Sequence, residues 1–117
     1  MIVVLPWPGR KLWPNARTHY HSKAAMVADY RFVAYERCVE GLEHPLPAEG
    51  KLPLSVTFCA PTKGKRDLDN MFASIKGGLD GVADALEIDD CRFEPVTLRR
   101  GEVVKGGLVF VQIGGVQ

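Results

Sequence analysis

Apolar residues recur along the first half of the chain in patterns that predict strands and a helix. The run 2–5 is continuously apolar and is followed by two prolines, which is typical of a short buried strand. Residues 54–58 alternate apolar and polar side chains, as a half-buried strand does. Between them, Ser22 is a suitable N-cap and Gly41 a suitable end for a helix with a broad apolar side. This half therefore predicts strand, helix and strand.

The second half contains the most regular helical pattern. Apolar residues recur there at steps of three and four over 69–86, which predicts one continuous helix. The pair Gly77-Gly78 lies inside it and costs roughly 1 kcal/mol per glycine relative to alanine, so we expect this helix to pack closely against another backbone. Two strands follow, around 93–99 and 108–113, and we expect 101–107 to join them as an antiparallel hairpin.

The predicted order is β-α-β-α-β-β, which indicates an α/β or α+β domain with helices packed on a mixed sheet. The 117 residues suit a single domain over 1–117, and 46% hydrophobic with 25% charged residues is typical of a folded protein. No apolar run approaches the ~20 residues of a membrane helix, and the N-terminus lacks the features of a signal peptide. We therefore expect no membrane association and a cytoplasmic location. Three widely spaced cysteines without a CxxC pair predict neither a disulfide framework nor a zinc knuckle.

Charge is segregated along the chain, although 15 basic and 14 acidic residues give a net charge of only +1. Segments 1–27 and 51–66 contain basic residues and no acidic ones, whereas 67–94 is strongly acidic. Such a run is typical of a solvated helix face. An acidic segment between basic ones is also what a cation site within a nucleic-acid-binding surface would produce.

Two pairs of acids stand out in this acidic segment. Asp67 and Asp69 lie two residues apart where a loop passes into the predicted helix, and side chains at i and i+2 of an extended backbone point the same way. Asp89 and Asp90 follow that helix, where a reversing chain could bring them near the sheet edge. Converging carboxylates repel unless a divalent cation neutralises them, and Mg²⁺ prefers such oxygen ligands. Helix capping and turn formation are the alternative explanation.

Lys76 is a candidate partner for these acids. It lies seven residues after Asp69, which is two turns along a continuous helix and returns it to the same face. Its side chain would lean toward the carboxylates and could stabilise negative charge on a scissile phosphate. The alternative is a surface ion pair with Asp80, four residues later.

These residues carry a resemblance that spans nearly the whole chain. The run Lys65-Arg66-Asp67-Leu68-Asp69-Asn70, then a helix and Ile88-Asp89-Asp90, resembles the signature of the RusA family of Holliday junction resolvases. Phage-borne members are also similar in the N-terminal segments Leu5-Pro6-Trp7-Pro8 and Pro14-Asn15-Ala16-Arg17-Thr18-His19.

The resemblance implies a small homodimeric endodeoxyribonuclease that uses Mg²⁺, or alternatively Mn²⁺. Such enzymes hydrolyse phosphodiesters of four-way junctions in DNA recombination and repair. By the family pattern, Asp67, Asp69 and Asp90 would be the catalytic, metal-binding carboxylates. The best-known members carry their functional lysine where this chain has Ala73, and Lys76 would take that role here.

Basic residues flank the acids and predict contacts with DNA. Lys63, Lys65 and Arg66 directly precede Asp67, and Arg17 belongs to a second basic set that is interleaved with aromatic residues. Such a loop could track phosphates or stack on an unpaired base. Two other functions remain open at this point: a non-catalytic DNA-binding or assembly module whose acids cap helices, and a nuclease that acts on flaps or forks.

Overall fold

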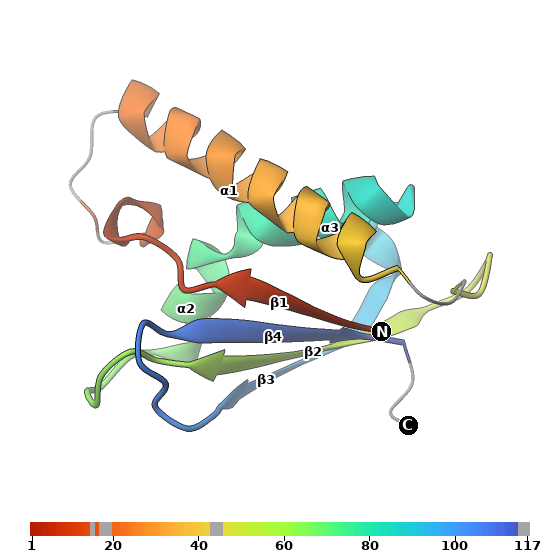
Figure 1. Ribbon diagram of the computed structural model, residues 1–117. Helices are drawn as coiled ribbons and strands as arrows, with labels where there is room; N and C mark the ends of the chain where they lie inside the picture. Colours follow the sequence, from red (N-terminus) through yellow and green to blue (C-terminus); the bar gives the residue numbers. More distant parts are fainter. Residues whose placement is uncertain (15, 17–19, 43–45, 115–117) are drawn as a thin grey trace.

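The computed structural model describes residues 1–14, 16, 20–42 and 46–114, and within them four strands form one mixed sheet. Three α-helices pack on one face of this sheet (Figure 1), which confirms a small α+β domain. No helix in these ranges is both long and apolar enough to cross a membrane. In chain order, the elements are β1 (Ile2–Pro6), the 3₁₀ turn η1 (Arg10–Leu12), α1 (Tyr20–Glu40), β2 (Leu52–Cys59), α2 (Leu68–Ser74), α3 (Lys76–Leu86), the 3₁₀ turn η2 (Asp90–Arg92), β3 (Phe93–Arg100) and β4 (Leu108–Ile113).

The strands lie in the order β1-β4-β2-β3. Strand β4 is antiparallel to both of its neighbours, and β2 is parallel to β3. The predicted hairpin between β3 and β4 is therefore wrong, because β2 lies between them. Backbone N–H groups of Gly101 and Val104 donate to the carbonyl oxygens of Phe58 and Ala60, at 2.9 and 3.0 Å. The connection thus crosses the carboxyl end of β2, so β4 pairs with the edge of β2 opposite to β3.

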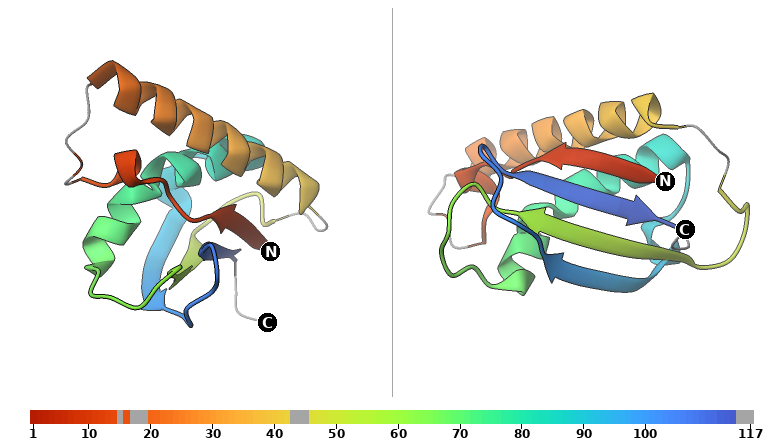
Figure 2. Two further views of the ribbon diagram at one scale, coloured as in Figure 1. Left: turned by 60° about the vertical axis from the view of Figure 1, so that its left-hand side comes forward. Right: turned by 60° about the horizontal axis from the view of Figure 1, so that its bottom comes forward.

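The core lies between the sheet and the helices (Figure 2). Alternate residues of β2 point into it, while Ser55 and Thr57 on the other face are only half-buried, so the half-buried strand predicted for 54–58 is confirmed. The N-terminal run also forms a strand, with Val3 and Leu5 fully buried. The buried strand residues on the helical side are Val3, Leu5, Leu52, Leu54, Val56, Phe58, Phe93, Val109, Val111 and Ile113.

The first helix follows its prediction except at its start. Helix α1 ends at Glu40, next to Gly41 as expected, but it begins at Tyr20. Ser22 is therefore not its N-cap and lies exposed within the first turn. The Tyr30 hydroxyl donates to the Pro6 carbonyl oxygen at 2.7 Å and so ties the middle of α1 to the end of β1.

The continuous helix predicted over 69–86 is wrong, because Ile75 divides it into α2 and α3. Ile75 has φ −103° and ψ 4°, outside the helical region, and its side chain is fully buried. The two helices run in different directions (Figure 2). The two-turn spacing expected between Asp69 and Lys76 therefore does not exist, and Lys76 is instead the first residue of α3.

Glycines allow α3 to lie against α1 at very short range. A Cβ atom on Gly78 would stand 2.6 Å from Cε2 of Tyr30, and one on Gly81 would stand 2.1 Å from the backbone oxygen of Arg31. The close packing expected from Gly77-Gly78 is confirmed, and its tightest point is Gly81. Arg31 also pairs with Asp84 across the two helices, with N–O distances of 2.7 and 2.9 Å.

Adding a methyl group at Gly81 should therefore destabilise the fold. We expect Gly81→Ala to lower the free energy of unfolding by about 2 kcal/mol, because overpacking against backbone outweighs the gain in helix propensity. Urea denaturation followed by circular dichroism measures this. Gly9→Ala is the matched control, since a Cβ there meets only the Met26 methyl group, at 3.9 Å. Equal stability of the two variants would contradict the close contact.

Candidate functional site

Lys76 and Asp90 form an ion pair on the surface, although they are fourteen positions apart. The Lys76 ammonium group donates to Oδ2 of Asp90 at 3.3 Å. Their side chains remain 54% and 45% exposed, so both stay accessible to a large ligand. The break at Ile75 places Lys76 at the start of α3, and η2 places Asp90 just before β3. In the described part of the chain, the ion pair of Lys76 is therefore with Asp90 and not with Asp80.

Asp89 stabilises the turn that presents Asp90. Its Oδ1 accepts the backbone N–H of Cys91 at 2.9 Å, so it caps η2. This hydrogen bond holds the pKa of the Asp89 carboxyl below its usual value. The same carboxylate raises the pKa of the exposed Cys91 thiol, through its hydrogen bond and its negative charge. Asp89 thus has the turn-forming role that was the alternative to metal binding.

Asp67 and Asp69 lie at the start of α2. Asp67 is the residue before the helix and has an extended backbone, but its side chain makes no capping hydrogen bond. Asp69 occupies the first helical turn. Both carboxylates are exposed. The helix start thus does not use the Asp67 side chain as its cap.

The structure does not bring all the predicted acids together. Asp67 follows the carboxyl end of β2, and its neighbour Arg66 accepts a hydrogen bond from Arg100, the last residue of β3, at 3.0 Å. Asp90 instead precedes the first residue of β3, and a strand of this length spans roughly 25 Å. Asp67 and Asp90 therefore lie toward opposite ends of β3.

The acids fit Mg²⁺ in donor type and exposure, but they do not form a preassembled three-ligand site. Among the described residues, no three His, Cys, Asp or Glu side chains lie close enough to hold a metal. Mg²⁺ often takes only one or two protein carboxylates and completes its shell with water and substrate phosphates. A three-carboxylate centre was the expectation, and the described residues do not assemble one, because Asp67 and Asp90 lie toward opposite ends of β3.

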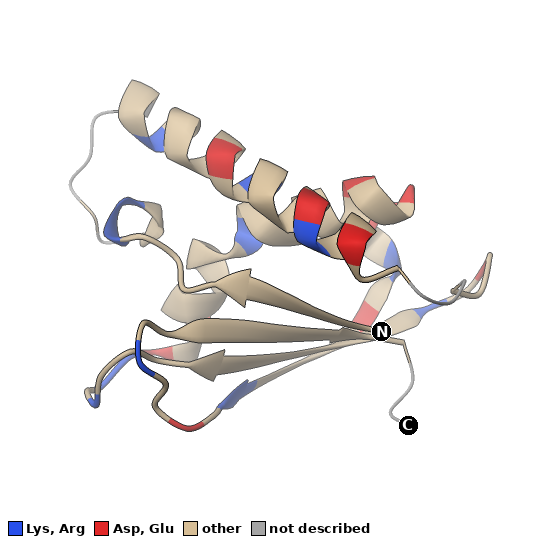
Figure 3. Cartoon of the chain, in the orientation of Figure 1, with Lys and Arg blue, Asp and Glu red and all other residues tan. Residues whose placement is uncertain are grey.

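Basic residues lie in the loops at the carboxyl ends of β2 and β3 and in η1 (Figure 3). Lys63 and Lys65 are exposed, and Arg66 is half-buried. Arg66 donates to the carbonyl oxygen and to Oγ1 of Thr62, at 2.9 and 3.0 Å, which fixes its guanidinium group. Arg17 and His19 lie outside the described residues.

Arg100 is a member of this region that the sequence did not single out, and Trp7, named only within an N-terminal segment, also belongs to it. Arg100 binds the Arg66 carbonyl oxygen, and the Arg66 guanidinium carbon lies 5.7 Å from the centre of the Trp7 ring. Neither contact has a local sequence signal, because each joins segments more than thirty residues apart.

The comparison with known proteins identifies a relative. No family model matches the chain. The chain is 41% identical, over 118 aligned positions, to a protein of Xylella fastidiosa (strain Temecula1 / ATCC 700964) that is described as "Uncharacterized protein". The alignment covers 97% of this chain and 76% of the relative. The chain therefore belongs to the same family as that protein, whose description names no activity.

The arrangement of Asp89 and Cys91 predicts the reactivity of the thiol. We expect Asp89→Asn to lower the pKa of Cys91, because the carboxylate that disfavours the thiolate is removed. More thiolate is then present at pH 8, so iodoacetamide should alkylate Cys91 faster. Asp29→Asn, an exposed change on α1, is the control. Cys38 and Cys59 are buried, and burial raises the pKa of Cys38 to about 11, so neither should compete in the folded protein. An unchanged rate would contradict this geometry.

Proposed function

We propose that the chain is a Mg²⁺-dependent, structure-selective endonuclease similar to the RusA family, which cuts branched DNA such as Holliday junctions. The observation that carries the proposal is the contact between Lys76 and Asp90. The sequence motif singles out Asp90 for phosphodiester chemistry, and Lys76 is the candidate for the family's functional lysine. The two residues meet on the surface from two different elements. A pair that is half exposed can be reached by the backbone of a DNA strand.

Each polar residue would have a separate task. The Lys76 ammonium group can stabilise the negative charge developing on phosphate oxygens. Asp67, Asp69 and Asp90 would provide exposed carboxylate oxygens for Mg²⁺ or Mn²⁺. Because Asp67 and Asp90 lie toward opposite ends of β3, one ion would take only one or two of these carboxylates, and water and substrate phosphates would complete its shell. The metal, when bound, would lower the pKa of an attacking water and shield the phosphate charge. Asp89 would hold η2 in shape and so keep Asp90 beside Lys76.

Basic residues would deliver the DNA strand to these groups. Lys63, Lys65 and Arg66 lie directly before Asp67, and we propose Arg17 as a further phosphate contact. Such contacts fix the position of a nucleic acid without reading its sequence. A four-way junction has two-fold symmetry and needs two cuts, so a homodimer with one site per subunit suits the reaction. The enzyme would act in the cytoplasm of a bacterial or phage-infected cell.

One observation favours a second candidate, a non-catalytic DNA-binding or assembly module. The described acids do not form a three-ligand group, and Asp89 serves as a cap. Such a module would bind DNA through its basic loops in a salt-dependent manner. It would show neither a requirement for Mg²⁺ nor a preference for branches.

Cleavage of a synthetic four-way junction separates the two candidates. With Mg²⁺ we expect nicks near the branch point and little cutting of a linear duplex of the same sequence, and with EDTA we expect binding without cutting. Asp69→Asn should abolish cutting and retain binding, because it removes a charge but preserves shape. Asp29→Asn is the control and should cut normally. Denaturing gels and gel-shift assays on the same samples give both readouts.

One result would reject the nuclease, and another would reject the catalytic role of Asp69. The first is an absence of cutting with Mg²⁺ and with Mn²⁺ by protein that binds the junction. The second is undiminished cutting by Asp69→Asn, which would remove the proposed role of this carboxylate. Preferential cutting of flaps or forks would keep the chemistry and change the substrate.

A further inference from the structure

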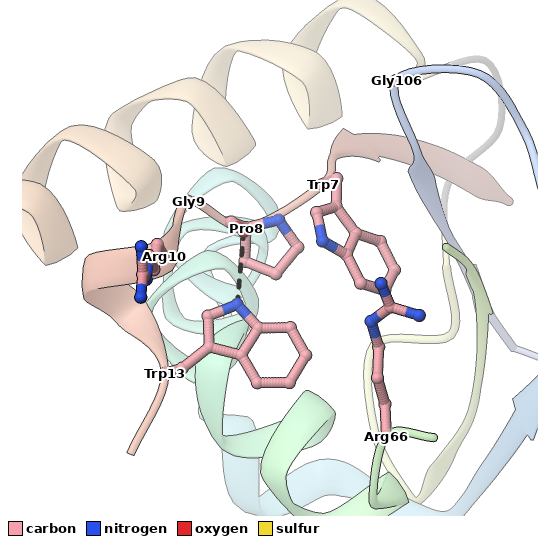
Figure 4. A pocket seen from close by; sticks show the side chains of 7 residues that line it. All are labelled: Trp7, Pro8, Gly9, Arg10, Trp13, Arg66 and Gly106. Carbon is pink, nitrogen blue, oxygen red and sulfur yellow. Dashed lines mark hydrogen bonds between the residues drawn. The ribbon is translucent and has the colours of Figure 1, made fainter. Parts of the chain in front are cut away.

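An open hollow lies beside the loop that carries Asp67, and two tryptophans form part of its wall (Figure 4). Its volume is about 500 Å³. Three segments build it: Trp7 to Trp13 after β1, Arg66 before α2, and Gly106 between β3 and β4. Such a volume lies within the range of small-ligand sites.

The side chains of this hollow are held in place. The Trp13 ring N–H donates to the Pro8 carbonyl oxygen at 3.4 Å. Arg66 lies over the Trp7 ring while its two terminal nitrogens bind Thr62. The centres of the two tryptophan rings are 6.0 Å apart and their planes are tilted by 43°, so the rings do not cover one another as a parallel stack would. These contacts hold Trp7 and Trp13 in place, so their flat rings form part of the wall of the hollow.

The charge of the lining selects the kind of ligand. Arg10 and Arg66 line the hollow, and no carboxylate is among the lining residues that the structure describes. An amine would meet two positive charges without a counter-charge, whereas a planar anion would find aromatic and cationic partners together. A nucleotide combines a flat base with a negative phosphate, and base stacking on tryptophan is tolerant of sequence.

We infer that the hollow between Trp7, Trp13 and Arg66 binds an unpaired nucleotide, with its base on the tryptophan surface and the phosphates on its two sides near Arg10 and Arg66, which lie on opposite sides of the tryptophans (Figure 4). The ligand is single-stranded nucleic acid, because a base inside a duplex cannot present its face. This inference rests on the proposed nuclease function for its biological role. Arg66 is covalently next to Asp67, so a strand held here passes directly to one of the proposed catalytic acids.

This placement gives a physical basis for selecting branched DNA. Fully paired DNA offers phosphates to the basic loops but no free base to the hollow. A branch point at which a base is unstacked offers both. The hollow would therefore favour branches over linear duplex before any bond is cut.

Binding measurements in EDTA test the site without cleavage. The probes are a fluorescein-labelled 12-residue oligothymidylate and a 12-base-pair duplex, followed by fluorescence anisotropy. We expect Trp13→Ala to weaken single-strand binding about tenfold, the usual effect of losing one stacked base, and to change duplex binding less than twofold. Phe32→Ala is the matched control, because Phe32 is an exposed aromatic residue on α1 outside the hollow. Arg10→Gln should weaken single-strand binding and reduce its salt dependence.

A second readout uses the unaltered protein and does not depend on the folding of a variant. A 2-aminopurine base placed in the single strand should lose emission on binding, because stacking on an indole quenches it. Equal single-strand affinity of folded Trp13→Ala and Phe32→Ala, or unchanged 2-aminopurine emission in the complex, would overturn the inference. If Trp13→Ala still cuts the junction and binds the single strand as tightly as the unaltered protein does, the nucleotide site is rejected and the proposed nuclease function stands. If single-strand binding depends on Trp13 but the unaltered protein does not cut the junction, the nucleotide site stands and the proposed nuclease function is rejected.

Discussion

The close contact between α1 and α3 is the constraint on which the rest of the structure depends. Gly78 and Gly81 have no side chains, and this lets the backbone of α3 approach Tyr30 and Arg31. Side chains of ordinary size would hold the helices further apart. Because α3 is drawn onto α1 while α2 follows a different direction, the chain breaks at the buried Ile75. That break sets the position of Lys76 at the start of α3. The contact between Lys76 and Asp90 therefore depends on how the helices pack.

The elements that the sequence predicted well are those with a local signal. Alternation in 54–58 marks β2, and Gly41 marks the end of α1, because both patterns depend only on neighbouring residues. The hairpin prediction failed because pairing of strands is not local, and β2 takes the place beside β4. The helix over 69–86 failed for a similar reason, since its break depends on how α3 meets α1.

The site shows the same division. The sequence named Asp90 and Lys76 but placed Lys76 beside Asp69, on the assumption of a continuous helix. The structure places it beside Asp90 instead. The tryptophan hollow depends on three segments that no single window of sequence contains, although Arg66 belongs to the motif and Trp7 to an N-terminal segment that the sequence analysis named. Residue chemistry was therefore easier to predict than residue proximity.

The central claim is that Lys76 and Asp90 act as one unit in phosphodiester cleavage. A double-mutant cycle on the single-turnover rate of junction cutting tests it most directly, with Lys76→Met, Asp90→Asn and the double variant. Lys51→Met is the control, because Lys51 is also an exposed lysine paired with an acid, Glu94, near the start of β3. If the two residues act together, each single variant loses about 10²-fold or more in rate, the double variant loses little more than the slower single one, and Lys51→Met cuts normally. Independent losses that multiply in the double variant, or no cutting by the unaltered protein, would contradict the claim.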